Sequence, residues 1–341
     1  MISWARAAAF RFVLVVVRAL RHDHRFLPLP RLRLPGSRET KTRAHRCRDC
    51  RIPPAWRKVW ICPHANGHIQ AVGVDAAGRR QYLYHERWRQ ERDEEKYDRV
   101  LSLAARLPEW REHVGEALRR RGRGRYRVEA VALRMLDRGV LRIGGEEYAE
   151  EHGSRGVATL LREHVTVRAD EVQLDFPAKS GVQRTLAFED AALATALRSL
   201  LRADAPPSDR LLVYRRGGEC FEVHADDVNA RFKDVAGDEY TVKDLRTWHA
   251  TVIAAVAFAD IGAASSKRAR SSAETEVMRE VAGVLGNTPR VARTSYVDPR
   301  VITAFDSGHT IASSLRRARR ASSEDAEREV VERAVIRLLG R

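Results

Sequence analysis

The sequence predicts an α+β protein: a small antiparallel β-sheet domain, then a mostly helical domain that contains a short three-stranded sheet. Residues 59–85 alternate apolar and polar side chains around the turn pairs Asn66-Gly67 and Ala77-Gly78, which is typical of hairpins. Residues 165–190 read as three short strands joined by two turns. From Val128 onward, apolar residues recur with the period of a helix.

We expect the chain to begin with a basic, disordered extension at residues 1–48. Its apolar run, residues 12–17, is too short to span a bilayer core of roughly 30 Å, and no small-residue cleavage site of a signal peptide follows. The next residues are rich in Arg and Pro. Cys47, Cys50 and Cys62 allow a zinc knuckle as a minor alternative, but no second C-x-x-C follows them.

Residues 49–122 form the predicted N-terminal domain. After its sheet, a helix is expected from about Glu86 to Leu107, where Pro108 interrupts it, and a further helix to Arg120. The basic, Gly-rich segment 119–127 (RRRGRGRYR) is predicted to be a hinge, serving either as a plain soluble linker or as a link that contacts DNA.

Residues 123–306 form the predicted helical domain. Its three strands turn at Ala169-Asp170 and at residues 179–181, and helices broken at Pro206-Pro207 and Gly217-Gly218 fill most of residues 190–296. Residues 307–341 form a separate tail whose last helix has one apolar stripe. The sequence leaves open whether this helix docks on the body or on another chain.

The composition indicates a folded protein that binds a polyanion. The chain has 62 Lys and Arg against 46 Asp and Glu, a net charge of +16, and 44% hydrophobic residues. Such an excess favours nucleic acid, held through its phosphates, although charge alone does not separate DNA from RNA or from an anionic membrane. Four cysteines in 341 residues do not make a disulfide scaffold, so we expect a reducing compartment.

Five residues match the chemistry of tyrosine attack on a phosphodiester. Arginine forks bind phosphate oxygens, a hairpin lysine can protonate a leaving oxygen, and an amide can donate to a nonbridging oxygen. Each residue also has an ordinary explanation: a surface arginine, a solvated lysine, a helix cap or a packed aromatic. The candidates are Arg142, Lys179, Arg246, Asn287 and Tyr296.

The short motifs around these residues resemble those of type IB DNA topoisomerases of the small poxviral and bacterial kind. They are RIGGEEY at residues 142–148, KSG at 179–181, KDLRT at 243–247, LGNTP at 285–289 and SYV at 295–297. The resemblance implies that Arg142 and Arg246 clamp the phosphate, Lys179 protonates the 5′ oxygen and Tyr296 is the nucleophile. At the fourth position Asn287 stands where the poxviral pattern has histidine, as in bacterial relatives, which leaves any titrating role there in doubt.

The resemblance also implies the remaining expectations. The strand RRQYLYH matches the family's strand in the DNA major groove, so Gln81, Tyr82 and Tyr84 are predicted DNA contacts, with sheet packing as the alternative for the tyrosines. The predicted activity is relaxation of supercoiled duplex DNA without metal or cofactor. We expect a cytoplasmic, nucleoid-associated monomer that clamps DNA and has no membrane partner. A tyrosine site-specific recombinase is the alternative function, although Lys243 stands where that family typically has histidine.

Overall fold

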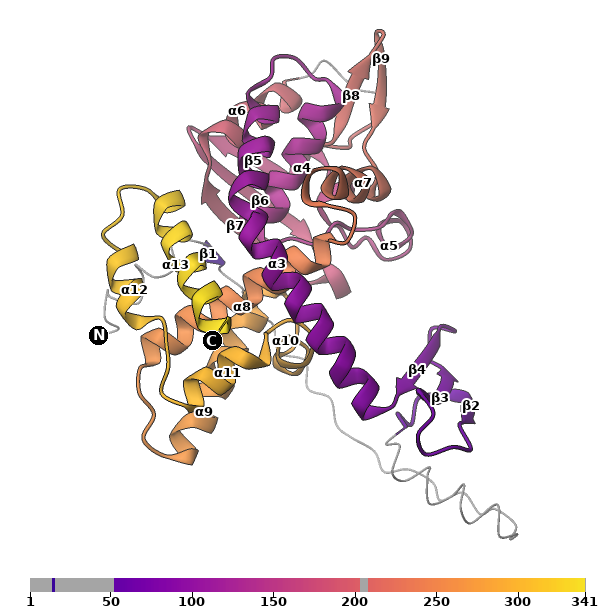
Figure 1. Cartoon of the computed structure of the whole chain (residues 1–341). Coiled ribbons are helices and arrows are strands. Elements are labelled where there is room, and N and C mark those ends of the chain that lie inside the picture. Colours follow the sequence, from indigo (N-terminus) through magenta and orange to yellow (C-terminus); the bar gives the residue numbers. More distant parts are fainter. Residues whose placement is uncertain (1–13, 16–51, 203–207, 341) are drawn as a thin grey trace. The chain divides into compact units, whose positions relative to one another are not determined.

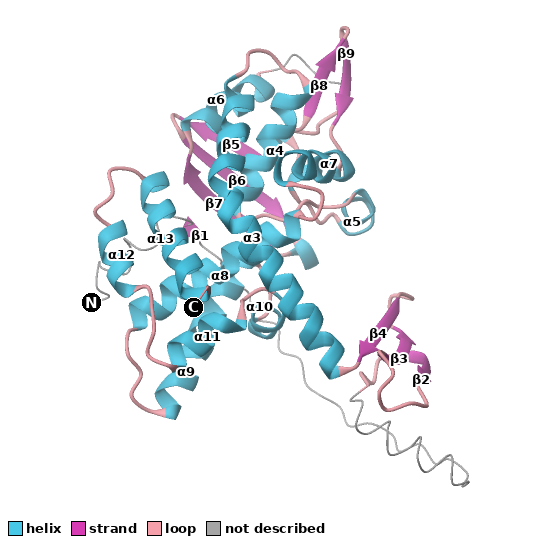
Figure 2. Ribbon diagram, in the orientation of Figure 1, coloured by secondary structure: helices cyan, strands magenta, loops and turns pink. Residues whose placement is uncertain are grey.

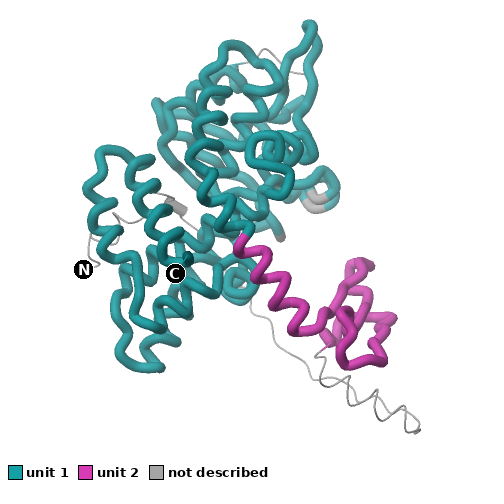
Figure 3. The backbone as a smooth tube through the Cα atoms, viewed as in Figure 1, with its two compact units in different colours: residues 1–18, 99–341 teal, residues 19–98 magenta. Residues whose placement is uncertain are grey.

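The structure is a computed structural model that describes residues 14–15, 52–202 and 208–340. It divides into two compact units, residues 1–18 with 99–341, and residues 19–98 (Figure 3). The mixture of helices with small antiparallel sheets confirms the predicted α+β class. Most of the predicted extension 1–48 lies outside the described residues.

The smaller unit contains the predicted N-terminal sheet. Strands β2 (Arg57–Ile61), β3 (Ile69–Val74) and β4 (Arg80–Tyr84) pair antiparallel in the order β2-β3-β4 (Figure 2). Asp75 forms the turn before β4 because its Oδ1 accepts hydrogen bonds from the backbone N–H groups of Ala77 and Arg79, each at 3.0 Å. Gly78 follows with φ of 79°, a left-handed conformation that glycine adopts without strain. The turn predicted at Ala77-Gly78 is confirmed.

Helix α3 (Glu86–Arg119) is continuous through Pro108, so the predicted interruption there is wrong. Proline lacks the N–H that would donate to the carbonyl four residues earlier, and its ring disfavours a helix interior. Leu107 and Trp110, on either side of the proline, are nevertheless 0% and 1% exposed. Burial of these side chains outweighs the local cost, and the helix ends only at the Gly-rich segment.

Segment 119–127 joins α3 to α4 (Arg125–Gly139), and Gly124 is the residue before the first turn of α4. The two compact units divide at residues 98 and 99, so this segment lies inside the larger unit. Its role as a hinge stays a prediction. The predicted boundary between residues 122 and 123 likewise stays a prediction.

The larger unit contains the predicted three-stranded sheet. Strands β5 (Val165–Arg168), β6 (Glu171–Pro177) and β7 (Gln183–Glu189) are antiparallel, and the short β1 (Leu14–Val15) pairs with the outer edge of β7. Helix α6 (Ala191–Leu201) packs on β5 and β6, and α4 packs on β7 (Figure 1). The sheet and these helices share one apolar core.

A second hairpin was not predicted. Strands β8 (Val213–Arg216) and β9 (Glu219–Glu222) pair antiparallel where the sequence indicated only a break in helical structure. Gly217 and Gly218 form the turn with φ of 60° and 89°, and two consecutive positive φ values are what the tightest hairpin turns require.

Short elements and helices complete the unit. Helix α5 (Glu146–His152) and the 3₁₀ turns η1 (Val157–Thr159), η2 (Arg162–His164) and η3 (Lys179–Gly181) lie around the sheet. The long helices are α7 (Ala225–Ala236), α8 (Val242–Ile261) and α9 (Lys267–Leu285). The chain then forms α10 (Pro289–Ser295), α11 (Pro299–Asp306), α12 (Ala312–Ala318) and α13 (Glu324–Leu339). No described helix is both long and apolar enough to cross a membrane.

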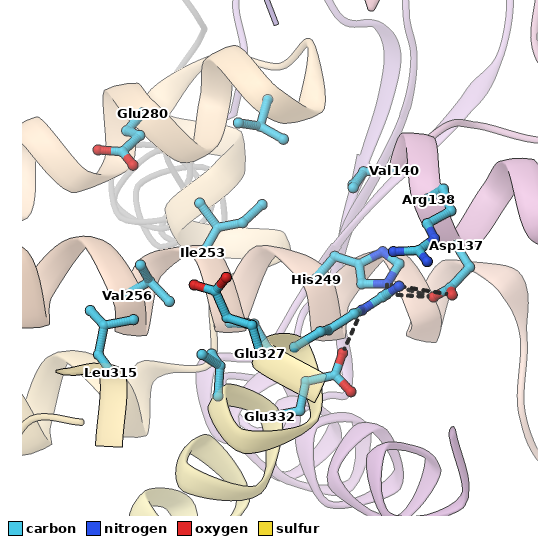
Figure 4. A pocket seen from close by; sticks show the side chains of 14 residues that line it. Asp137, Arg138, Val140, His249, Ile253, Val256, Glu280, Leu315, Glu327 and Glu332 are labelled. Atoms are coloured by element: carbon cyan, nitrogen blue, oxygen red, sulfur yellow. Dashed lines mark hydrogen bonds and ion pairs between the residues drawn. The ribbon is translucent and has the colours of Figure 1, made fainter. Parts of the chain in front are cut away.

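The C-terminal helix α13 docks on the body of the same chain, which settles the alternative that the sequence left open. Val331, Val335 and Leu339 are buried, and α13 packs against α8 and α12. Beside this apolar contact, Arg328 and Glu332 of α13 are buried in a group of charges. Glu332, Asp137 and His249 of this group are labelled in Figure 4.

Asp137 of α4 is the centre of this charge cluster. Arg328 donates to its two carboxylate oxygens at 3.0 and 2.6 Å, and Arg111 of α3 donates to it at 3.0 Å. Glu332 accepts from both arginines, at 2.7 Å from Arg111 and 3.1 Å from Arg328. Burial alone would raise the pKa of Asp137, but attraction to Arg111 and Arg328 outweighs it and holds that pKa well below its usual value. The cluster, defined by Asp137, Glu332, Arg111 and Arg328, therefore has no net charge.

His249 of α8 lies against the charge cluster, with Nε2 2.9 Å from the Arg328 guanidinium and 3.1 Å from Asp137 Oδ1. Arg328 has only donors, so this nitrogen accepts and the imidazole is neutral. Burial, assisted by repulsion from Arg328 and Arg111, lowers the pKa of His249 despite the neighbouring Asp137. The charged residues of α3, α4 and α13 thus pack against His249 of α8. Arg246 lies three residues before His249 on the same helix.

Candidate active site

The five predicted catalytic residues line one groove of about 990 Å³ in the larger unit. They come from five separate places in the fold: the loop after α4, the β6–β7 hairpin, the first turns of α8, the loop after α9 and the end of α10. In that order they are Arg142, Lys179, Arg246, Asn287 and Tyr296. Residues separated by as many as 154 positions therefore share one surface.

The loop that carries Arg142 is held by a close approach of two glycines. Gly144 has φ of 83°, and a side chain on it would have its Cβ 2.7 Å from the backbone nitrogen of Gly156. The N–H of Val157 donates to the Arg142 carbonyl at 2.9 Å, and that of Ala158 donates to the Ile143 carbonyl at 2.7 Å. Only glycine satisfies both the backbone angle and the space at position 144.

Arg246 is positioned by the cap of α8. Thr241 is the N-cap, and the backbone N–H of Thr241 donates to the Asp244 carboxylate at 2.9 Å, which completes a capping box. Arg99 donates to the same carboxylate at 2.9 Å. These contacts fix the first turn of α8, and Arg246 lies in the next turn.

Arg246 is 5% exposed, and its guanidinium donates to the carbonyls of Val140 and Leu285. Burial, followed by repulsion from Arg142 and Arg184, lowers the pKa of Arg246 to about 9. The guanidinium therefore stays charged at neutral pH.

Tyr296 ends α10 and faces Arg246. The Arg246 guanidinium carbon lies 5.6 Å from the centre of the tyrosine ring. Thr251 of α8 anchors the chain here, because its hydroxyl accepts from the Asp298 N–H at 3.1 Å and lies 3.4 Å from the Tyr296 carbonyl. The hydroxyl proton has a nearer acceptor in the Thr247 carbonyl, at 3.0 Å. Val297, between Tyr296 and Asp298, is fully buried. The same helix therefore holds both Arg246 and the segment of the tyrosine.

The side chain of Asn287 does not cap a helix, although the sequence allowed that explanation. Thr288 is the N-cap of α10 and accepts from the Val291 N–H at 3.3 Å. The Asn287 backbone N–H instead donates to the Ala282 carbonyl at 2.9 Å, after a left-handed Gly286 that ends α9. Its side-chain Oδ1 accepts from Arg142, and its buried Nδ2 has no partner among the described residues. One amide donor is thus available beside the groove.

Lys179 is exposed at the tip of the β6–β7 hairpin, in the turn η3, which ends with a left-handed Gly181. In the part of the chain that the structure describes, its ammonium group has no carboxylate partner. Within the same part, no group of three or more His, Cys, Asp or Glu side chains is arranged to hold a metal ion. Of the three cysteines considered for zinc, only Cys62 is described, as a free buried thiol.

The predicted DNA contacts lie on β4 of the smaller unit. Tyr82 is 45% exposed, whereas Tyr84 stacks on Trp88 with ring centres 4.3 Å apart. Gln81 donates to Asp75 at 2.9 Å. Tyr82 is the most accessible of the three side chains, and Tyr84 contributes to packing in the free protein.

Sequence reasoning missed Arg184 of β7, which is 8% exposed and lies behind the groove. Its Nη2 donates to the carbonyls of Gly139 at 3.2 Å and Val284 at 2.8 Å. A signal was present: Arg184, Leu186 and Phe188 occupy the alternate, buried positions of this strand. A charged residue in the buried phase of a strand indicates a special environment.

Comparison with known families completes the description. Residues 85–320 match the family model of the eukaryotic DNA topoisomerase I catalytic core, which is more than half of the chain. Residues 35–75 match the N-terminal domain of bacterial DNA topoisomerase IB. The chain belongs to the type IB DNA topoisomerase family. As a type IB topoisomerase, it is a DNA-binding isomerase.

A viral relative covers most of this topoisomerase. The chain is similar to the DNA topoisomerase 1B of Acanthamoeba polyphaga mimivirus, with 28% identity over 260 residues. The similarity spans 74% of this chain and 76% of the relative.

Proposed function

We propose that the protein relaxes supercoiled duplex DNA through transient cleavage of one strand, with Tyr296 as the nucleophile. The observation that supports this most directly is the groove in which Tyr296 faces Arg246, with Arg142 and Asn287 at the same surface. A phenol beside fixed positive charges suits attack on an anionic phosphodiester.

The proposed step exchanges one phosphodiester for another. The Tyr296 Oη gives its proton to solvent water and forms a bond to the scissile phosphorus, and the bond from phosphorus to the 5′ oxygen breaks. Lys179 gives a proton to that leaving oxygen, which becomes a free 5′ hydroxyl, and the 3′ phosphate stays on the tyrosine. Religation is the same step in reverse. The exposed hairpin position of Lys179 at the groove is consistent with this role.

Arg142 and Arg246 hold the negative charge of the nonbridging oxygens in this proposal. Guanidinium forks bind phosphate oxygens in pairs and remain charged at neutral pH. The unpartnered amide nitrogen of Asn287 adds a neutral donor. With this charge supplied by side chains, the reaction needs no divalent metal. The energy of the broken bond is kept in the phosphotyrosine, so no ATP is consumed.

Between cleavage and religation, the free strand swivels about the intact one and releases supercoils of either sign. We propose that the chain acts as a monomer that clamps the duplex, with Tyr82 and its neighbours Gln81 and Tyr84 contacting DNA from the smaller unit. The exposed ring of Tyr82 supports this assignment.

The deciding experiment compares the parent protein with Tyr296→Phe on supercoiled plasmid in EDTA without nucleotide. The parent should relax the plasmid and leave a covalent protein–DNA band after denaturation. The variant should do neither and should bind duplex DNA with nearly the same affinity, because only one hydroxyl is lost. A covalent band from Tyr296→Phe, or complete dependence on a divalent ion, would refute the mechanism. Exchange between two specific sites without relaxation would instead support a recombinase.

A further inference from the structure

Three arginines bind the C-terminal end of α9 in successive steps. Arg184 donates to the carbonyl of Val284, Arg246 to that of Leu285, and Arg142 to that of Gly286 at 3.3 Å. Two of them also bind the end of α4 in the same order. Arg184 takes the carbonyl of Gly139, and Arg246 takes the next one, Val140. Arg184 and Arg246 therefore each connect the C-terminal end of α4 to the C-terminal end of α9.

No carboxylate of the described residues pairs with any of these three arginines. Their charge is held by helix C-termini, where unpaired carbonyls and the macrodipole concentrate about half an elementary negative charge. Burial, followed by repulsion from Arg142, lowers the pKa of Arg184 to about 10. A guanidinium kept in so unfavourable a place requires an explanation beyond ordinary packing.

Arg184 differs from the other two arginines in its access to the groove. Arg142 and Arg246 line it, whereas Arg184 does not. Its guanidinium lies behind Gly286, since a side chain at that glycine would have its Cβ 3.4 Å from Arg184 Nη1. Arg184 therefore does not touch the substrate, and any effect on the reaction must pass through its neighbours.

We propose that Arg184 is a positioning residue for strand cleavage: it ties the ends of α4 and α9 together so that Arg246 meets the scissile phosphate in one fixed orientation. Without it, the carbonyls of Gly139 and Val284 lose their shared donor. The carbonyls of Val140 and Leu285, one residue further along, then lose the fixed spacing that orients Arg246. The proposal rests on the proposed function of Arg246 and Tyr296.

The test is a double-mutant cycle in single-turnover cleavage of a pre-bound duplex, using Arg184→Met, Arg246→Ala and the double variant. Arg184→Met should slow cleavage by about 10- to 100-fold, because misplacement by an ångström costs up to about 10² in rate. Duplex Kd should change by less than about threefold. The double variant should cleave as slowly as Arg246→Ala alone, since Arg184 acts through Arg246.

Two results overturn the proposal. Cleavage by Arg184→Met at the parent rate would show that Arg184 has no positioning role. A double variant slower than Arg246→Ala by the full factor of Arg184→Met shows that Arg184 acts independently of Arg246. Failure of the proposed function has a different signature: Arg246→Ala then cleaves at the parent rate, or Tyr296→Phe forms the adduct.

Controls separate positioning from loss of structure. Arg162→Met is matched, because Arg162 also donates to the last carbonyl of a helix, Leu201 of α6, but lies outside the groove lining. It should leave the cleavage rate of the folded protein unchanged. If Arg184→Met does not fold, Arg184→Lys decides the matter. Lysine keeps the charge but lacks the planar fork, so about tenfold slower cleavage supports the proposal and parent-level cleavage overturns it.

Discussion

Replacing Asp137 with asparagine tests whether the charge cluster secures the C-terminal helix to the rest of the larger unit. Asparagine has nearly the same shape as aspartate, so packing is preserved while the charge and one of the two acceptor oxygens are lost. Asp137 is 1% exposed, and four hydrogen bonds from Arg111 and Arg328 converge on it. The variant leaves two buried guanidinium groups facing only Glu332.

The magnitude follows from that imbalance. Removing one partner of a buried ion pair typically costs about 3–5 kcal/mol, because the other charge stays buried without compensation. For a unit of roughly 150–250 residues, each kcal/mol lowers Tm by about 2–4 °C, so we expect a fall of about 6–20 °C.

The assay is thermal unfolding followed by circular dichroism at pH 7.5, with Asp260→Asn as the matched control. Asp260 also binds the C-terminal tail, through Arg319 at 2.6 Å, but this pair is about one third exposed. An exposed pair contributes about 0–1 kcal/mol, so the control should shift Tm by only a few degrees at most. The double variant Asp137→Asn/Arg328→Met rebalances the cluster and should recover part of the loss. A Tm for Asp137→Asn within the range of the control would refute the reasoning.

Three further predictions concern pH, the amide and the lysine. Burial lowers the pKa of His249, so as the pH falls the unfolded chain binds a proton at this residue before the folded chain does. The free energy of unfolding should therefore fall by up to about 1.4 kcal/mol from pH 7.5 to 5.5. Urea unfolding of His249→Gln should show a shallower fall over the same pH range. Asn287→His should keep substantial cleavage because imidazole also donates, whereas Asn287→Ala should lose more; equal single-turnover rates in all three proteins would dismiss the donor role. Lys179→Ala should slow cleavage by about 10²–10⁴ on an ordinary duplex yet cleave a 5′-thiolate-leaving duplex nearly as fast as the parent; an equal defect on both duplexes would make Lys179 a phosphate ligand instead.

The elements that the sequence predicted well are those whose signal is local. Alternation and glycine turns predicted the two sheets, because strands such as β6 and β7 bury every second side chain. The continuous α3 could not be predicted in this way. The preference against Pro108 is local, whereas the burial of Leu107 and Trp110, each contributing about 1.5–3 kcal/mol, depends on distant neighbours. The β8–β9 hairpin was missed because apolar and polar residues do not alternate in its two strand sequences, VYRR and ECFE.

In the candidate site, too, the sequence predicted the residues that have a local signal and missed those that depend on distant neighbours. Motifs pointed to five of the residues that line the groove, because the proposed nucleophile, proton donor and charged donors need particular side chains. Their supports are backbone carbonyls, which have no sequence signature. Nothing in the residues around Gly139 or Val284 reveals that their carbonyls hold Arg184. The cluster around Asp137 was missed for a related reason: Arg328 and Asp137 are 191 positions apart, and charged residues are common throughout the chain.

The choice of carbonyls over carboxylates has a chemical consequence for the proposed reaction. A carboxylate paired with Arg246 would match the guanidinium fork as well as a phosphate does, and a substrate would have to displace a full negative charge. Helix-end carbonyls carry only partial charge, so they orient the guanidinium groups while leaving most of the positive potential in the groove. The cost appears as the lowered pKa values of Arg142, Arg184 and Arg246, each caused first by burial and none offset by a carboxylate. Binding of a phosphodiester would supply the missing negative charge. In the proposed mechanism these arginines therefore favour the DNA-bound state over the free one, and two of them, Arg142 and Arg246, are the residues that hold the phosphate.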